Sequence, residues 1–119
     1  PVHHGDIPAL AWRIEIAGQS IVITGSFNNS KNLVATFAKD ADVLVVSHAI
    51  PENSRGVLRD LYARPSQLGR VADQADARMM ILGHRSARTR GRESQSRNAI
   101  EENYDGTILF ANDGECWGL

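Results

Sequence analysis

Two short, continuously apolar runs, at residues 43–46 and 79–82, most strongly constrain what this chain can fold into. A run of apolar residues without polar alternation is typical of a β-strand that is covered on both faces. The segment between them carries apolar residues at helical spacing, beginning at Pro65, a residue favoured in the first turn of a helix. Strands of this kind, separated by helices, indicate an α/β protein.

Hydrophobic periodicity and turn residues predict the other elements. The segment 17–19 joins the first two strands as a hairpin, and Asn112-Asp113-Gly114 is a strong turn signal for a second hairpin at the end. Because both ends are hairpin-like, we expect a mixed sheet in the order β-β-α-β-α-β-α-β-β. The predicted strands are 9–16, 20–24, 43–46, 79–82, 107–110 and 115–119; the predicted helices are 32–39, 65–75 and 93–104, with a further short one at 55–62.

The length of 119 residues predicts a single domain over 1–119, and 42% hydrophobic residues is an ordinary globular composition. Thirteen basic against fourteen acidic side chains leave a net charge of −1, which gives no drive toward nucleic acid or an anionic membrane. The longest apolar runs are too short to cross a bilayer. We therefore expect neither nucleic acid nor a membrane as partner.

The single cysteine, Cys116, excludes an internal disulfide and a multi-cysteine metal site. It favours a reducing compartment, so we expect a cytoplasmic protein, and its apolar neighbours in the predicted last strand indicate a buried, inert thiol. The first residues contain no secretory pattern and no initiator methionine. This leaves open that the chain is one piece of a longer protein.

Three histidines stand at the ends of predicted strands. His4 precedes the first strand, His48 follows the third and His84 follows the fourth. Ligands of open α/β sheets gather at strand ends, and histidine trios are common zinc ligands. No two of these histidines show a close ligand spacing, however, and a loop histidine that is hydrogen-bonded to backbone remains the alternative interpretation of His48.

A set of motifs in a shared order extends over nearly the whole chain. It comprises His-Gly-Asp-Ile-Pro-Ala-Leu-Ala-Trp-Arg-Ile-Glu at 4–15, Ser-Ile-Val-Ile-Thr-Gly at 20–25, Asn-Leu at 32–33, Ala-Lys-Asp-Ala-Asp-Val-Leu-Val-Val at 38–46, Ala-Ile-Pro-Glu at 49–52, Pro-Ser-Gln-Leu-Gly-Arg-Val-Ala at 65–72, Ile-Leu-Gly-His-Arg at 81–85 and Phe-Ala-Asn-Asp-Gly at 110–114. In this order the chain resembles the C-terminal half of a metallo-β-lactamase-fold hydrolase, in the ribonuclease Z and arylsulfatase-like branch.

The resemblance implies half of an αβ/βα sandwich, with helices on one face of a mixed sheet. It also implies a binuclear site for zinc, iron or manganese at the rim, where the metals activate a water. Carried over position by position, it gives metal ligands His4 and His84 and pocket-lining residues Ser26, His48, Tyr62 and Arg85.

Three departures from the family pattern argue against a complete metal site. Ser26 stands where relatives have the aspartate that bridges both metals, and a hydroxyl is a poor ligand beside a carboxylate. Leu61-Tyr62 replaces a Leu-His pair, and the family's His-x-His-x-Asp-His motif is absent. We therefore assign no catalytic residue and expect a truncated or degenerate binding or structural module. The alternative is part of a metal-dependent hydrolase acting on phosphoester, sulfate ester or related substrates.

An arginine-rich segment follows His84 and allows two interpretations. It either captures an anion such as phosphate or sulfate, or it is a solvated loop paired with Glu93, Glu101 and Glu102. The arginines are Arg85, Arg88, Arg90, Arg92 and Arg97, of which Arg88, Arg90 and Arg92 are the candidates for anion binding.

Half of a sandwich has one sheet face that its own helices do not cover. We expect the chain to bury this face by forming a homodimer or by packing against a missing N-terminal half. The residues that three short helices are not expected to cover are Val22, Leu44, Val46, Met80 and Leu82.

Overall fold

A five-stranded mixed sheet in the order β1-β2-β3-β4-β5 organises the chain. The structure is a computed structural model that describes residues 1–118. β1 runs antiparallel to β2 as the predicted hairpin, while β2, β3, β4 and β5 are parallel to one another. The strands are β1 (Trp12–Ile16), β2 (Gln19–Ile23), β3 (Val43–Ser47), β4 (Met79–Gly83) and β5 (Thr107–Phe110).

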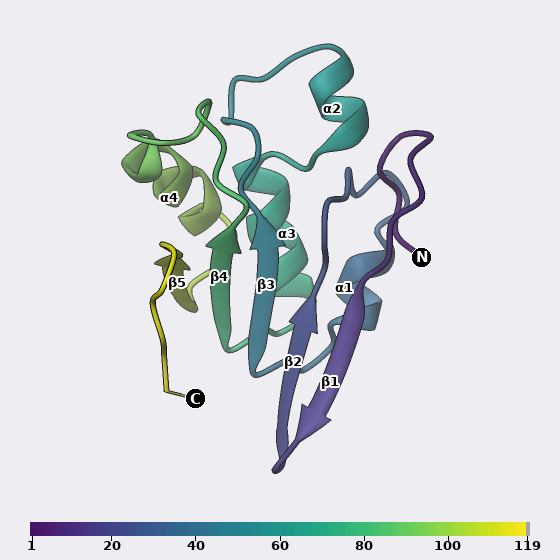
Figure 1. Ribbon diagram of the computed structural model, residues 1–119, viewed down its shortest axis with the longest axis vertical. Helices are drawn as coiled ribbons and strands as arrows, with labels where there is room; N and C mark the ends of the chain where they lie inside the picture. The colour runs from purple at the N-terminus through teal and green to yellow at the C-terminus, as the bar shows by residue number, and fades with distance from the viewer. Residues whose placement is uncertain (119) are drawn as a thin grey trace.

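Helices cover one face of this sheet, as the resemblance to half of a sandwich implies. Figure 1 shows α1, α3 and α4 behind the sheet and α2 beyond the upper ends of the strands. The short segment at 55–62, left out of the predicted element order, does form a helix. No helix within residues 1–118 is long and apolar enough to cross a membrane. The helices are α1 (Leu33–Phe37), α2 (Val57–Leu61), α3 (Pro65–Gln74) and α4 (Glu93–Glu101).

Local sequence determines where α3 begins. Pro65 occupies the first turn, and the Gln67 side chain accepts a hydrogen bond of 3.0 Å from the Arg64 N–H. The Ser66 N–H donates to a Glu52 carboxylate oxygen at 2.8 Å, and the Ser66 hydroxyl donates to the other oxygen at 2.6 Å. These side chains satisfy N–H groups that the first turn leaves without partners.

The five apolar residues expected to remain uncovered are all buried, so that prediction is wrong. They have exposed fractions of 0–2% beneath the helices. The physical reason is that small residues lie among the covering ones: Ala35 in α1 and Ala72 in α3 are buried, and Gly69 allows α3 to approach α4 closely. Three short helices cover more of a sheet when they lie close to it. The buried residues in question are Val22, Leu44, Val46, Met80 and Leu82.

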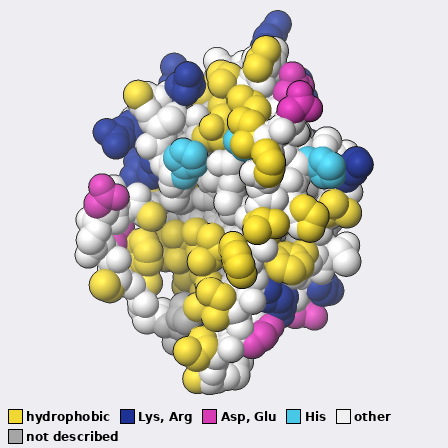
Figure 2. All heavy atoms as spheres, turned by 45° about the vertical axis from the view of Figure 1, so that its right-hand side comes forward, with side chains coloured by type: hydrophobic (Ala, Val, Ile, Leu, Met, Phe, Trp, Pro, Cys, Tyr) yellow, Lys and Arg dark blue, Asp and Glu magenta, His cyan; other side chains and the backbone are white. Residues whose placement is uncertain are grey.

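An uncovered apolar face does exist, but it is the opposite face of the sheet. The register places the side chains of Trp12, Ile14, Ile16, Ile21, Ile23 and Val45 together on it. We call this set the open face. Trp12 is 63% exposed and Ile16 60% exposed, unusually high fractions for large apolar side chains. Figure 2, which brings the β1 side forward, shows hydrophobic side chains gathered across this surface.

The prediction of a final strand at 115–119 is wrong for its described part. Residues 115–118 are not in a strand, Cys116 is exposed rather than buried, and Leu119 lies outside the described residues. The turn at 112–114 forms, but the Asn112 N–H and amide both donate to the Glu115 carboxylate, at 3.0 and 2.8 Å. These side-chain bonds take the place of the ladder hydrogen bonds that a hairpin requires.

Candidate functional site

The candidate site lies where the parallel strands β2, β3 and β4 end. The carboxyl ends of parallel strands meet at one edge of a sheet, which is where α/β proteins bind ligands. Here the strand ends bring together Ser26, Ser47 and His84, although these residues are far apart in the sequence. They line a shallow pocket of about 230 Å³.

His84 is the centre of this rim. Its Nδ1 lies 3.4 Å from the Ser26 hydroxyl and 3.5 Å from the Ser47 hydroxyl. Its backbone has a φ of +48°, in the left-handed region that non-glycine residues seldom adopt. The Ser47 hydroxyl also donates to the Gly25 carbonyl at 3.0 Å. The imidazole is therefore exposed to solvent but oriented by two hydroxyl groups.

Tyr62 connects the two predicted metal ligands. Its ring packs edge-on against His4, with centroids 5.0 Å apart, and against His84, with centroids 6.2 Å apart. The His4 Nδ1 donates to the Leu61 carbonyl at 2.5 Å, so this nitrogen carries the proton and Nε2 is the ring nitrogen left to bind a metal. The two histidines thus approach the same rim, and each is in contact with the tyrosine ring.

His48 is not part of the lining of this rim pocket; its side chain is buried, with an exposed fraction of 1%. Its Nε2 lies 2.7 Å from the Ser96 hydroxyl, and its ring packs against Phe110 with centroids 5.4 Å apart. Burial, and next the positive charge of Arg85, lower the pKa of His48 to about 4. The residue was expected in the pocket because β3 ends there, but the turn after Ser47 directs its side chain beneath the rim toward α4.

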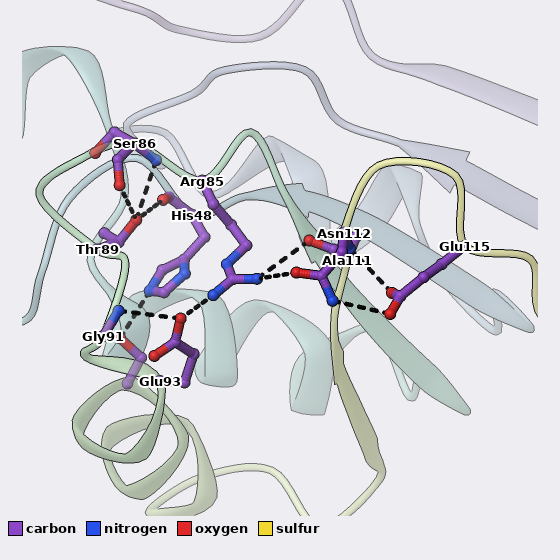
Figure 3. Close-up of polar contacts among 10 residues, drawn as sticks. His48, Arg85, Ser86, Thr89, Gly91, Glu93, Ala111, Asn112 and Glu115 are labelled. Atoms are coloured by element: carbon purple, nitrogen blue, oxygen red, sulfur yellow. Dashed lines mark hydrogen bonds and ion pairs between the residues drawn. The ribbon is translucent and has the colours of Figure 1, made fainter.

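Arg85 connects the arginine-rich segment to α4 and to the residues that follow β5 (Figure 3). Its guanidinium forms an ion pair with Glu93 at the start of α4. It also donates to the Ala111 carbonyl at 3.3 Å and to the Asn112 side chain at 2.8 Å. Hydrogen bonds from Asn112, and to a smaller extent the charge of Arg85, lower the pKa of Glu115. Arg85 therefore stabilises the contacts between these segments, and it also lines a larger pocket.

The larger pocket, about 590 Å³, lies on the other side of His84. The three candidate anion-binding arginines are all exposed; Arg90 lines this pocket, whereas Arg88 and Arg92 do not. Arg97 is paired with Glu101 on α4 at 3.8 Å, as expected for a solvated helix face. The full lining is Gly83, His84, Arg85, Arg90, Ala111, Asn112 and Asp113.

The residues present do not make up a metal site. Within residues 1–118, no group of three or more His, Cys, Asp or Glu side chains lies close enough to hold a metal ion. Structural and catalytic zinc sites need at least three protein ligands, and here the rim offers two imidazoles and hydroxyls. Ser26 contacts His84 with a neutral oxygen, where a bridging carboxylate would be needed.

Sequence reasoning missed Ser47. This residue orients His84 as closely as Ser26 does, and it links β3 to the turn after β2. The available signal was its position directly after the apolar run 43–46, at the same end of the sheet as Gly25 and His84. A short polar residue at that position is a reasonable candidate in any parallel sheet.

The fold matches that of solved metallo-β-lactamase-fold proteins. The metallo-β-lactamase fold protein YhfI from Bacillus subtilis superposes with a TM-score of 0.76 at 21% identity, covering 90% of this chain and 43% of that one. No known family profile matches the sequence. The chain is therefore a metallo-β-lactamase-fold protein, and the predicted α/β class with helices on one face of a mixed sheet is confirmed.

Among curated proteins, the chain is similar to a ribonuclease Z. That of Halorubrum lacusprofundi is 30% identical over 99 residues, which cover 82% of this chain and 32% of that protein. The resemblance expected from the motif order is thereby confirmed. The chain spans about a third of the ribonuclease Z and less than half of the YhfI chain.

Proposed function

We propose that this chain is a binding or structural module that buries its open face against a second β-sheet and does not hydrolyse substrates by itself. The observation that carries the proposal is the open face. Its large side chains are exposed together, and contiguous apolar patches on soluble proteins mark interaction sites. The proposal includes a cytoplasmic location, which the single cysteine favours.

The energetics favour association. Each large apolar side chain removed from water stabilises a complex by about 1.5–3 kcal/mol. Trp12, Ile14, Ile16 and Ile23 are between 39% and 63% exposed, so each has much of this stabilisation still to gain. The partner sheet is either that of a second copy or that of an N-terminal half.

The rim supports a non-catalytic role. Hydrolysis by a binuclear site requires ligands that fix both metals, and within residues 1–118 no three His, Cys, Asp or Glu side chains lie close enough to hold one. The hydroxyl of Ser26 supplies no negative charge to hold two cations. An association module needs none of these ligands, only the apolar sheet surface.

The second candidate function is part of a metal-dependent hydrolase acting on a phosphoester or sulfate ester. It is favoured by the similarity to ribonuclease Z and by the convergence of His84, Tyr62 and His4 on one rim. In this case zinc, iron or manganese would bind once other ligands are supplied.

Metal analysis separates the two functions. We expect the purified chain, incubated with zinc, iron or manganese and then desalted, to retain less than one ion per chain and to remain folded. The reason is that two imidazoles do not hold a metal tightly. Two tightly bound ions that are lost in His84→Ala but kept in His3→Ala would instead establish the hydrolase, because His3 makes no contact with the rim histidine.

Light scattering tests the open face. We expect the chain to self-associate and Ile23→Lys to weaken this association at least about tenfold, because an ammonium group would be buried against an apolar surface. The matched control is Val57→Lys, which changes an apolar side chain that is 72% exposed on α2, away from the open face. Unchanged association in Ile23→Lys would contradict the proposed role of the face, and a wild-type monomer would exclude a second copy as its partner.

A further inference from the structure

β1 is an edge strand with a free side. It is hydrogen-bonded to β2 on one side, and the described sheet ends there. Natural proteins usually protect such edges with proline, bulges or charged side chains, because the free N–H and C=O groups invite another strand. β1 is a regular five-residue strand, Trp-Arg-Ile-Glu-Ile, without proline or a bulge, and its two charged side chains are of opposite sign.

The sequence of β1 is self-complementary about its central residue. In an antiparallel pair of two β1 strands centred on Ile14, each Arg13 lies opposite the Glu15 of the other copy. On the other side of the strand, Trp12 lies opposite Ile16, and the two Ile14 side chains face each other. Opposite charges and aromatic–aliphatic pairs are the cross-strand combinations that stabilise antiparallel strands.

Arg13 and Glu15 already lie where this pairing requires them. Arg13 and Glu15 lie on the same face of β1 and already form an ion pair of 2.6 Å within one chain. Arg13 is held in place by donating to the Lys39 carbonyl at 2.8 Å after α1. Glu15 is exposed over 62% of its side chain and is thus available to a second arginine.

We infer that the free edge of β1 pairs antiparallel with β1 of a second copy, centred on Ile14. A two-fold axis through Ile14 makes the interface isologous, with the same contacts given and received by both copies. The two sheets join into one, and the two open faces become a single continuous apolar surface. Edge pairing leaves this joined surface uncovered, so the inference rests on the proposed function for the partner sheet that buries the open face, and it assigns the second copy to a different surface, the free edge of β1.

Charge exchange tests the register. Glu15→Arg places a second guanidinium opposite Arg13, and Arg13→Glu places a second carboxylate opposite Glu15, so each variant alone should dimerise about tenfold more weakly. An equimolar mixture should recover wild-type affinity, because every cross-strand pair is then of opposite charge. Affinity is measured by analytical ultracentrifugation and folding by circular dichroism. Single variants that dimerise like wild type, or folded variants whose mixture does not recover, would overturn the pairing.

Cysteine trapping gives an answer that does not depend on Arg13. In a Cys116→Ser background, Ile14→Cys should form a disulfide-linked dimer, because the two Cα atoms of directly opposed residues lie at about 4.5–5.5 Å. Ile16→Cys is the matched control; its own copy lies about 13 Å away along the paired strands, so no such dimer should form. Equal trapping of both variants would overturn the register.

The experiments distinguish a failure of the edge pairing of β1 from a failure of the proposed association through the open face. Ile23→Lys changes the face and leaves the β1 edge intact, so Ile14→Cys trapping should persist in that background. Glu15→Arg changes the edge, on the side of β1 opposite to the open face. Loss of trapping in Ile23→Lys would show that the second copy packs through the face and would overturn edge pairing.

Discussion

Replacing Gly69 with alanine is expected to destabilise the protein by about 3 kcal/mol, the upper end of the range for an overpacked core. A Cβ atom at this position would lie 2.6 Å from the Ile100 carbonyl oxygen and 3.0 Å from its Cα. Both are backbone atoms of α4, so neither can move without shifting the helix. Urea denaturation measures the loss as a lower midpoint.

The matched control for this variant is Gly83→Ala. Gly83 is also a glycine inside a regular element, at the end of β4, but its Cβ would meet no atom within 4 Å. We expect a change of less than about 1 kcal/mol, since only the backbone entropy of the unfolded chain is altered. Equal losses in the two variants would show that the contact between α3 and α4 does not limit packing.

His48 is expected to make stability depend strongly on pH between 6.5 and 4. Its pKa in the folded protein is about 4, against 6.5 when unperturbed, because burial disfavours the imidazolium. In this window the unfolded chain binds the proton and the folded chain does not, so acidification favours unfolding. The shift corresponds to a loss of about 3 kcal/mol as the pH falls from above 6.5 to 4, levelling off below.

The control variant is His48→Gln, which retains a polar group near Ser96 but does not titrate. Chemical denaturation at a series of pH values from 7.5 to 4 gives the slope for both proteins. We expect the acid-dependent loss to be about 3 kcal/mol smaller in the variant. A variant with the same slope as wild type would assign the pH dependence to other groups. Asp42 is not among the expected contributors, since its pKa is lowered by hydrogen bonds from Ser20 and its effect falls at more acidic pH.

Local patterns were sufficient to predict most of the elements. The continuous apolar runs became the buried strands β3 and β4, and Pro65 marks the first turn of α3. Prediction was wrong for residues 115–118, because the turn signal at 112–114 is the same whether a strand follows or a carboxylate closes the turn. Only the contacts of Asn112 with Glu115 and Arg85 distinguish the two outcomes.

The candidate site could be predicted in part. Strand ends bring Ser26 and His84 together, which follows from the order of parallel strands. The burial of His48 could not be read from the sequence, since it depends on Ser96 and Phe110, which lie about fifty and sixty residues away. Long-range partners of this kind have no periodic signature.

By itself, the sequence determined the α/β class and the hairpin at the start, which depend on periodicity and turn chemistry, properties of neighbouring residues. The existence of an uncovered apolar face followed from the resemblance to half of a sandwich. Only the tertiary structure decided which face is open. Both faces of β2 and β3 are apolar in sequence, and the small residues of α1 and α3, with Gly69 against α4, determine which of them the helices cover. Which face the helices cover is determined by close packing between segments that are distant in the sequence. This packing depends on the shapes of surfaces that meet only in the folded chain.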